Sequence, residues 1–430
     1  MQEREFLEKV RSCGGRVFIA GGWVRDKLRG ALPKDKDYVI TGLAEPIFCR
    51  IFPAAAKVGK SFPVYLLSVD GRDCEIAFAR TEKKTGAGYR GFAVNYDETV
   101  TIEEDLYRRD TTMNSMALEL PDEQLIDPYG GQQDVKRRLI RATSRHFCED
   151  PVRALRAARQ AAELDFAIEL QTLGQMRQCA VELSAEPTER LFQELVRALG
   201  AARPSLFFIM LDKAGLLAGV FPELHALRGQ RQPAEFHPEG DAFVHSLQVL
   251  DQTAGMVPEP FVRFAALVHD LGKGLTPKNT LPHHYGHEHG GLLAMDGWAR
   301  RMTFPRRWLQ AAEFVICEHM RAPRLKKPGK VVALLLKAAK NPIGIAGLKA
   351  IILADHKSLP FYLAEAETYI AAIHAVSAGD CPATLQGREI GSWLRQQQIA
   401  AYIKAAVSLA DLLFSEKYCI IKVMRYRLTA

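Results

Sequence analysis

The pattern of hydrophobic and polar residues changes character along the chain. Up to about residue 140, short apolar runs alternate with turn residues, which is typical of strands in a sheet. We predict strands at 17–20, 38–41, 64–69, 75–79 and 125–126, and helices at 23–29 and 113–120. From residue 141 onward, apolar residues recur with helical spacing at 151–164, 188–199, 261–270 and 331–339. The pattern therefore predicts an α+β head with a small mixed sheet, followed by all-α regions.

Composition narrows the class of protein. With 430 residues, the chain is long enough for about three domains of ordinary size. Eight cysteines are scattered without a CxxC pair, and the first residues carry no signal-peptide pattern. No apolar run is long enough to span a membrane, so we expect a reduced, cytoplasmic protein without a membrane partner. The net charge of +7 is consistent with a nucleic-acid partner but does not establish one.

Two motifs near the N-terminus indicate nucleotide chemistry. Gly21 and Gly22 follow the first predicted strand and precede a helix, so their backbone N–H groups can approach a phosphate. Asp35 and Asp37 alternate with a lysine, and on an extended segment both carboxylates project from one face. Such a pair suits Mg²⁺ ions that also bind nucleotide phosphates, and Glu75 on a later strand is a third carboxylate for this site. An isolated DxD is more often a solvated turn, but the preceding glycine motif favours metal binding.

A second motif runs through Arg108, Arg109 and Asp110 to Asn114. Two adjacent arginines suit a triphosphate. Asp110 and Asn114, one turn apart on a helix, suit ribose hydroxyl groups. Taken alone, the same residues are equally compatible with the charged, exposed start of a helix.

A third motif surrounds Pro151, which fits the first turn of a helix with acidic residues before it. Asp150 and Arg153 have i, i+3 spacing, so they are expected to share a face of that helix. A carboxylate acceptor fixed beside a guanidinium donor matches the pairing edges of adenine and cytosine, and it rejects guanine and uracil. Without the other motifs, an ordinary intrahelical salt bridge is the simpler interpretation.

Taken together, the motifs GGWVRD, DKD, RRDTTMN, DPYGG and EDPVRALR, followed by HSL and HDLGKG, resemble those of the class II tRNA nucleotidyltransferases with a fused HD domain. The likeness covers essentially the whole chain. It implies a polymerase β-like head and untemplated addition of C, C and A to tRNA 3′ ends from CTP and ATP, with release of pyrophosphate. It also implies a head at 1–140, a helical neck and body that bind base and RNA at 141–225, an HD domain at 226–375, and a helical tail at 376–430.

The resemblance assigns roles to residues of this chain. Asp35 and Asp37 would hold Mg²⁺, with Glu75 as the third catalytic carboxylate. The implied nucleotide-binding residues are Gly22, Arg25, Arg108, Asp110, Asn114, Asp150, Arg153, Arg156 and Arg159. Segment 80–90 resembles the loop with which the family switches from C to A addition, and its glycines and charges predict mobility.

Two positions depart from the family pattern. Gln160 stands where members of the family usually have an aromatic residue, and Asp165 stands where they usually have glycine. We expect both to be local packing changes in the neck, which supports the base-reading pair.

Eight of the twelve histidines lie between residues 237 and 319. His269 and Asp270 follow an apolar run, so we expect them at the end of a buried helix. Imidazole and carboxylate ligands suit Mn²⁺, Ni²⁺, Fe or Mg²⁺. The order of these residues resembles the HD phosphohydrolases, which implies phosphatase and 2′,3′-cyclic phosphodiesterase activity.

The same resemblance implies ligand roles within this segment. The implied metal ligands are His245, His269, Asp270 and Asp355, with His287 and His319 as candidates for a second metal ion. Lys273 is a candidate phosphate contact. We interpret His283, His284 and His289 as structural or exposed.

The densest basic stretch adjoins the proposed nucleotide site. It comprises Arg137, Arg138, Arg141, Arg145, Arg153, Arg156 and Arg159. Such groups can hold the acceptor stem and 3′ end of tRNA, although a solvated face with ion pairs is the alternative for about half of them. Segment 386–405 is an amphipathic helix that resembles the family's tail, which contacts RNA or a second subunit. We therefore expect a monomer or a homodimer.

Three alternatives share parts of this pattern. A bacterial poly(A) polymerase has the same head motifs, but it carries long basic extensions, which are missing here, and lacks an HD segment. An enzyme that adds only CC or only A is the second alternative, against which the loop-like segment argues. The third is an RNA-binding head that serves only an HD phosphohydrolase, against which the intact carboxylates argue.

Overall fold

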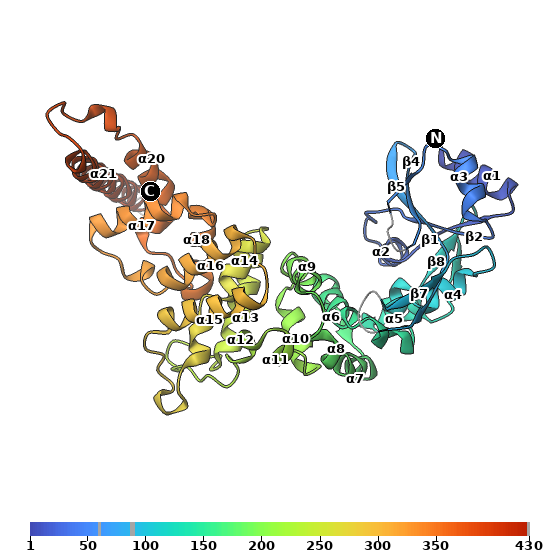
Figure 1. Ribbon diagram of the computed structural model, residues 1–430. Helices are drawn as coiled ribbons and strands as arrows, with labels where there is room; N and C mark the ends of the chain where they lie inside the picture. The colour runs from blue at the N-terminus through green and yellow to red at the C-terminus, as the bar shows by residue number, and fades with distance from the viewer. Residues whose placement is uncertain (59–61, 87–90, 428–430) are drawn as a thin grey trace. The chain divides into compact units, whose positions relative to one another are not determined.

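The computed structural model describes residues 1–58, 62–86 and 91–427, with side chains of the last helix described up to residue 409 (Figure 1). The chain divides into two compact units, Met1–His225 and Ala226–Ala430. The finer division into four regions stays a prediction. Residues 87–90 of the segment predicted to be mobile lie outside the described residues.

A mixed sheet of seven strands organises the head. In spatial order the strands are β3 (Ala56–Lys57), β4 (Val64–Val69), β5 (Arg72–Phe78), β2 (Tyr38–Thr41), β1 (Arg16–Ala20), β8 (Ala117–Glu119) and β9 (Gln124–Ile126). β2 and β5 are parallel, and the other neighbours are antiparallel. The predicted mixed sheet and all of its predicted strands are confirmed, with small shifts of their ends.

Helices cover both faces of this sheet. They are α1 (Glu3–Ser12), α3 (Glu45–Ile51) and α4 (Ile102–Tyr107). On one face, Phe6 of α1 packs on Tyr38 with ring centroids 5.2 Å apart, and Phe48 of α3 packs on Phe78 at 5.5 Å. On the other face, Leu106 of α4 belongs to a buried cluster with residues of β1 and β2. Because both faces are buried, the register of the central strands is strongly specified.

Two predicted helices differ from the structure. Segment 113–120 is not a helix: a 3₁₀ turn, Thr112–Asn114, leads directly into strand β8. β8 pairs with the buried strand β1, and that pairing outweighs local helix propensity, which is a weak influence. The helix predicted at 261–270 ends early, because α14 (Pro260–Leu267) gives way to a turn. His269 and Asp270 lie in this turn, not on a helix.

The described part of segment 80–90 contains a strand, and its mobility stays a prediction. β6 (Thr81–Lys84) pairs antiparallel with β7 (Phe92–Asn95) in a separate two-stranded ribbon. Glu82 on β6 accepts from Arg80 at 2.9 Å and from Arg108 at 3.0 Å. The charges of this segment are therefore partly used in ion pairs that hold the strand to the head.

Helices complete the first unit. They are α2 (Gly22–Leu28), α5 (Gly131–Arg137), α6 (Val152–Leu164), α7 (Leu170–Gln178), α8 (Ala180–Leu183), α9 (Thr188–Leu199), α10 (Ser205–Lys213), α11 (Leu217–Val220) and α12 (Pro222–His225). α6 is buried along most of its length. Asp165 ends α6 with a φ of +54°, a conformation that favours glycine, and its carboxylate pairs with Arg203 at 2.6 Å. This explains the departure at position 165 as a helix cap.

The regular elements of the second unit are all helices among the described residues. Its longer helices are α13 (Ala242–Ala254), α14, α15 (His287–Arg301), α16 (Arg306–Glu318), α17 (Pro328–Lys340), α18 (Gly344–His356), α20 (Ala366–His374) and α21 (Arg388–Arg427). Residues of α17 and α18 form much of its largest buried cluster. Among the described residues, no single helix is long and apolar enough to cross a membrane, and only the bent pair α17 and α18 passes that test by length and composition. The predicted order of an α+β head before helical regions is confirmed.

Candidate functional site

Three carboxylates gather where β2 begins. Asp37 directly precedes β2, and the parallel register Tyr38↔Ile76 sets it beside Glu75 on β5. Strand alternation directs Asp37 and Glu75 to the face that α4 covers. Burial and the nearby charges of Glu75 and Asp35 raise the pKa of Asp37. Three like charges this close favour a bound cation, and an all-oxygen donor set fits Mg²⁺.

Two of these carboxylates border a pocket of about 620 Å³. Gly22 and Arg25 from α2 line the same pocket as Asp35 and Asp37, so these four predicted residues lie together. The residue before α2, Gly21, has a φ of +88°, and a Cβ there would lie 2.9 Å from Arg109 Nη1. Only glycine fits this position, because both the backbone conformation and the arginine exclude a side chain.

The two adjacent arginines share one buried partner. Asp105 accepts from Arg108 Nη2 at 2.6 Å through Oδ1 and from Arg109 Nη2 at 2.9 Å through Oδ2. Burial opposes ionisation of Asp105, but the two guanidinium charges hold its pKa well below the usual range. Arg109 also faces Gly21, and its charge acts on Asp37 to lower that residue's pKa. Sequence reasoning assigned both adjacent arginines to the triphosphate but left Asp105 out of the site, although its i, i+4 spacing from Arg109 was a usable signal.

Asp110 connects the head to the neck helix α6. Its Oδ1 accepts from Asn114 Nδ2 at 3.2 Å, and its Oδ2 accepts from Arg156 Nε at 2.9 Å. Arg25 Nη1 donates to Asn114 Oδ1 at 2.9 Å, which ties this group to the pocket. Gln160 Nε2 also donates to Asp110 Oδ2, at 3.0 Å. The structure thus brings the predicted residues together and adds Gln160, which we predicted to be a packing change only.

Asp150 and Arg153 do not pair with each other among the described contacts, and their role in reading the base stays a prediction. Asp150 accepts from Arg190 Nη2 at 3.0 and 2.9 Å, whereas Arg153 donates to the His146 carbonyl at 2.6 Å and lies 3.8 Å from Glu82. The reason is that Asp150 precedes α6 and does not share a helix face with Arg153. A carboxylate beside a guanidinium is present, but Arg190 supplies the guanidinium.

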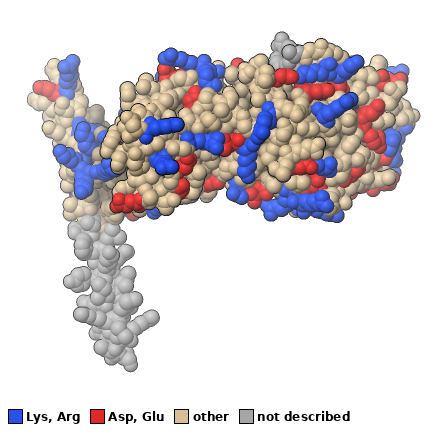
Figure 2. Space-filling view, turned by 90° about the horizontal axis from the view of Figure 1, so that it is seen from below, with Lys and Arg blue, Asp and Glu red and all other residues tan. Residues whose placement is uncertain are grey.

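The predicted nucleotide-binding residue Arg159 has other partners than Asp110 and Asp150. Its guanidinium pairs with Glu194 and Glu163, each at 2.6 Å, and its side chain is buried. Four further members of the basic stretch also pair with acidic residues: Arg138, Arg141, Arg153 and Arg156. On the face in Figure 2, basic and acidic side chains are interspersed. RNA binding by the seven arginines therefore stays a prediction.

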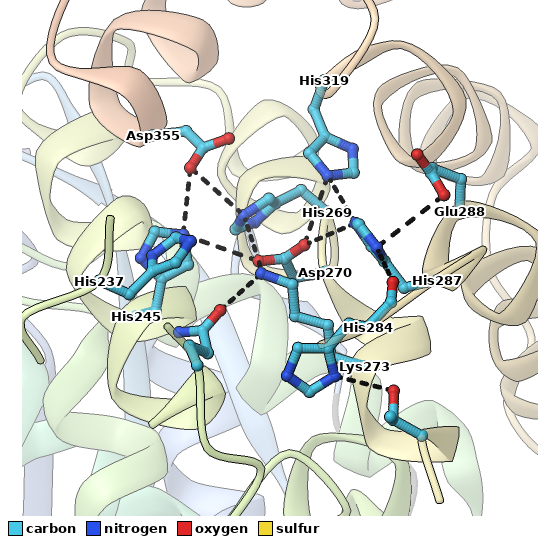
Figure 3. Close-up of polar contacts among 12 residues, drawn as sticks. His237, His245, His269, Asp270, Lys273, His284, His287, Glu288, His319 and Asp355 are labelled. Atoms are coloured by element: carbon cyan, nitrogen blue, oxygen red, sulfur yellow. Dashed lines mark hydrogen bonds and ion pairs between the residues drawn. The ribbon is translucent and has the colours of Figure 1, made fainter. Parts of the chain in front are cut away.

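The second unit carries a cluster of histidine and aspartate side chains (Figure 3). It gathers His245 from α13, His269 and Asp270 from the turn after α14, His287 from α15, His319 at the end of α16, and Asp355 from α18. All six predicted metal ligands of the HD segment meet here, and each side chain is almost fully buried.

Asp270 joins the two halves of this cluster. Its Oδ2 lies 3.1 Å from His269 Nε2 and 3.7 Å from His245 Nε2. Its Oδ1 lies 3.2 Å from His287 Nε2 and 3.3 Å from His319 Nε2. Within each half, the candidate ligand atoms of Asp270 and its two histidines lie within 4.8 Å of one another. The arrangement suits one metal ion per half, with Asp270 shared.

The ring orientation of the histidines supports this interpretation. Nδ1 of His269 and of His287 donates to a backbone carbonyl at 2.8 Å, and Nδ1 of His319 does so at 3.1 Å. Nδ1 of His245 donates to Glu239 Oε1 at 2.6 Å. Each Nε2 is therefore left as an acceptor that faces the cluster. His269 Nε2 and Asp270 Oδ1 are buried without a hydrogen-bond partner, as expected if they bind divalent metal ions.

Sequence reasoning missed the residues that contact the candidate metal ligands from outside the cluster. Glu239 accepts from His245 and also from His237 Nδ1 at 3.1 Å, and His356 Nε2 lies 3.1 Å from Asp355 Oδ2. The short spacing of His237 and Glu239 just before α13 was the only signal. Such partners orient metal ligands and raise their basicity.

Two other predictions for this segment have different outcomes. Lys273, the candidate phosphate contact, is buried and lies 2.6 Å from Asp270 Oδ2 and 2.5 Å from Gln232 Oε1. In this arrangement it neutralises the bridging carboxylate. His284 hydrogen-bonds to Thr276 Oγ1 at 2.8 Å and to the Arg231 carbonyl at 2.9 Å, so its structural role is confirmed.

The orienting role of Glu239 can be tested directly. We expect Glu239→Gln to lower the affinity of the His245 half for Mn²⁺ by roughly tenfold or more, because the acceptor behind His245 loses its charge. The His287 and His319 half should keep its affinity. Calorimetric titration with Mn²⁺ measures both, and Glu235→Gln is the matched control on the exposed surface nearby. An equal loss in both halves, or none, contradicts this role.

Three family models match successive parts of the chain. A model of the poly A polymerase head domain matches residues 17–141, and one described as a probable RNA and SrmB-binding site of polymerase A matches residues 165–228. A model of the HD domain matches residues 242–356. The fold and these matches define a nucleotidyltransferase that carries an HD phosphohydrolase domain.

Curated relatives narrow this class to one family. The multifunctional CCA protein of Nitrosococcus oceani is 40% identical over 413 residues, which cover 91% of this chain and 98% of the relative. That of Xanthomonas campestris pv. campestris is 40% identical over 408 residues with the same coverage. The chain belongs to the family of multifunctional CCA proteins, which are class II CCA-adding enzymes.

Solved structures share the fold at low identity. The CCA-adding enzyme of Bacillus stearothermophilus, solved in complex with CTP, is 22% identical with a TM-score of 0.63, over 96% of this chain and 98% of that one. A tRNA nucleotidyltransferase, solved with a primer tRNA and an ATP analogue, is 22% identical with a TM-score of 0.57, over 86% and 98%. These likenesses support the fold of the whole chain.

Proposed function

We propose that this chain adds C, C and A to the 3′ ends of tRNA, with CTP and ATP as substrates and pyrophosphate as the released product. The observation that carries the proposal is the meeting of Asp35, Asp37 and Glu75 beside the pocket that holds Gly22 and Arg25. Mg²⁺ held by Asp35 and Asp37 would lower the pKa of the attacking 3′-hydroxyl and stabilise the leaving pyrophosphate.

The surrounding residues bind and orient the nucleoside triphosphate. The backbone at Gly22 and the guanidinium groups of Arg25 and Arg109 contact the triphosphate, because they lie next to the carboxylates. Asp110 and Asn114 accept and donate at the ribose. Arg108 and Arg156 act through their buried partners Asp105 and Asp110, and Arg159 braces the neck.

The base is read at the N-terminus of α6. The Asp150 carboxylate, oriented by Arg190, accepts from the amino group of cytosine or adenine, and Arg153 donates to the neighbouring ring nitrogen. Arg153 is 8% exposed, and its guanidinium is oriented by the hydrogen bond from Nη1 to the His146 carbonyl at 2.6 Å.

Arg153→Ala should therefore relax base choice. We expect selection against UTP to fall by about 10- to 100-fold, the value of one good hydrogen-bonded base contact. Competing CTP and UTP on a tRNA transcript that ends before CCA measures this. Arg137→Ala, an exposed arginine of the same basic stretch, is the control and should keep the selection. Unchanged selection against UTP in the Arg153 variant rejects the base-reading role.

We further propose that the HD cluster hydrolyses phosphomonoesters and 2′,3′-cyclic phosphates at RNA ends. Divalent ions held by the two halves around Asp270 would supply a hydroxide nucleophile near neutral pH. The orphaned acceptors His269 Nε2 and Asp270 Oδ1 carry this proposal, since metal binding satisfies both.

One assay separates the transferase reactions. Purified protein is incubated with tRNA transcripts that end before CCA, after C or after CC, and with each nucleoside triphosphate. Completion of CCA on all three supports the proposal. Long A-tails identify a poly(A) polymerase, and addition of only C or only A identifies a partial enzyme. No incorporation, with phosphate release from a 2′,3′-cyclic end, leaves only the HD activity.

A further inference from the structure

We propose that Gln160 is a positioning residue for the ribose of the bound nucleotide, and that it supports selection of ribonucleotides over deoxyribonucleotides. The inference rests on the proposed transferase function and names a residue of its nucleotide site. Gln160 lies on α6 and is 1% exposed. It is the one neutral side chain of α6 that contacts Asp110 among the described hydrogen bonds.

The carboxylate of Asp110 has no acceptor position to spare. Its Oδ1 accepts from the Thr111 backbone N–H at 2.8 Å and from Asn114 Nδ2 at 3.2 Å. Its Oδ2 accepts from Arg156 Nε at 2.9 Å and from Gln160 Nε2 at 3.0 Å. A carboxylate offers about four such positions, so a ribose hydroxyl binds only if one partner yields.

The partners differ in how easily they yield. The Thr111 N–H is fixed by the backbone, and Arg156 contributes a charge-assisted bond, which is the stronger kind. Asn114 is neutral and only half-buried, so the ribose hydroxyl can replace its amide at Oδ1. Oδ1 is therefore the oxygen that accepts from the ribose hydroxyl, and Oδ2 is held by Arg156 and Gln160 of α6.

Gln160 is built to stay in place. Its Oε1 accepts from Thr111 Oγ1 at 3.0 Å while its Nε2 donates to Asp110, so both ends of the amide are used. The Asp110 carboxylate can only accept, so the Nε2 end of the amide must face it. The Thr111 hydroxyl can donate to the Oε1 end, and these two partners fix the orientation of the amide. Thr111 is itself fully buried. With the hydrogen bond from Arg156 alone, the Asp110 carboxylate could still rotate. The second hydrogen bond to Oδ2, from Gln160 Nε2, prevents this rotation.

The consequence is specific to the 2′-hydroxyl. A carboxylate fixed at Oδ2 presents Oδ1 in one direction, and the 2′-hydroxyl of a ribonucleotide can donate to it. A deoxyribonucleotide has no such donor, so it gains nothing from the fixed orientation. Loss of Gln160 should therefore weaken binding of CTP and ATP while leaving binding of dCTP and dATP nearly unchanged.

The test uses the full chain and equilibrium binding. Gln160→Met keeps the side-chain length and removes both hydrogen bonds. We expect the preference for CTP over dCTP, measured by calorimetric titration, to fall by roughly five- to tenfold, which is the value of one ordinary hydrogen bond, because Gln160 acts on the ribose only through Asp110. KM for CTP should rise similarly at nearly constant kcat. Thr111→Val, which removes the anchor of Gln160 and a 3.5 Å contact of the hydroxyl to Asp110 Oδ1, should shift the preference in the same direction by less.

Thr172→Val is the control for lost stability. Thr172 is buried in the same unit and accepts from the Ala142 N–H at 2.9 Å, and none of its described hydrogen bonds involves Asp110 or Gln160. It should leave the CTP to dCTP ratio unchanged. Equal weakening of CTP and dCTP in Gln160→Met, or an unchanged ratio in both it and Thr111→Val, overturns the inference. Absence of incorporation by the unmodified protein instead refutes the proposed transferase, so the two failures are distinguishable.

Discussion

Replacing Asp35 and Asp37 together by alanine should abolish nucleotide incorporation, with a loss of at least about 1,000-fold. The two carboxylates are the candidate Mg²⁺ ligands, and a bound metal ion supplies several kcal/mol of charge stabilisation in phosphoryl transfer. The fold should survive, because Asp35 and Asp37 lie in the loop before β2 and are not part of the hydrophobic core of the head. Thermal stability should stay equal or rise, since the like charges that raise the pKa of Asp37 are removed.

Incorporation of labelled CTP and ATP into tRNA transcripts measures this effect. Asp122→Ala removes an exposed carboxylate from the turn between β8 and β9 and should leave incorporation unchanged. The double variant should keep its activity toward a 2′,3′-cyclic phosphate. If both activities disappear together while the protein stays folded, the proposal of two independent sites is wrong.

The reciprocal change is Asp270→Asn in the second unit. Because Asp270 lies within 3.7 Å of all four cluster histidines, its loss should reduce bound metal in both halves. We expect phosphohydrolase activity to fall by at least about 100-fold, because the hydroxide nucleophile depends on the metal. Metal content per chain, measured by atomic absorption after loading with Mn²⁺, gives a readout independent of activity.

Two comparisons complete this experiment. His287→Gln removes a ligand from one half only, so it should release about half of the Mn²⁺ that Asp270→Asn releases. Both variants should still complete CCA on a tRNA transcript. Full metal content in Asp270→Asn contradicts a shared ligand, and loss of CCA addition would contradict the separation of the two sites.

Site residues that lie close together along the chain could be predicted from the sequence. The Asp35 and Asp37 pair and the glycines before α2 depend on strand alternation and on a tight turn, which are local properties. The histidine and aspartate residues of the HD segment were found through their order along the chain, and all six meet in the structure. Local errors occurred where pairing with a distant strand overrode helix propensity, as in segment 113–120.

Contacts between site residues that lie far apart along the chain could not be predicted from the sequence. Asp150 pairs with Arg190, and Asp110 is held by Gln160, across separations of 40 and 50 residues. Glu239 and His356, by contrast, lie six residues and one residue from His245 and Asp355, the ligands that they contact, and sequence reasoning missed them despite this short spacing. Nothing in a linear pattern says which buried polar groups will satisfy one another.

The sequence by itself determined the family, the α+β head before helical regions, and the residue types of both sites, because hydrophobic periodicity and motif spacing are written along the chain. The tertiary structure alone decided the partners: which guanidinium orients Asp150, which amide fixes Asp110, and which oxygen of Asp270 faces each pair of histidines. The physical reason is that buried polar groups must be paired, and the fold determines which donors and acceptors come within reach.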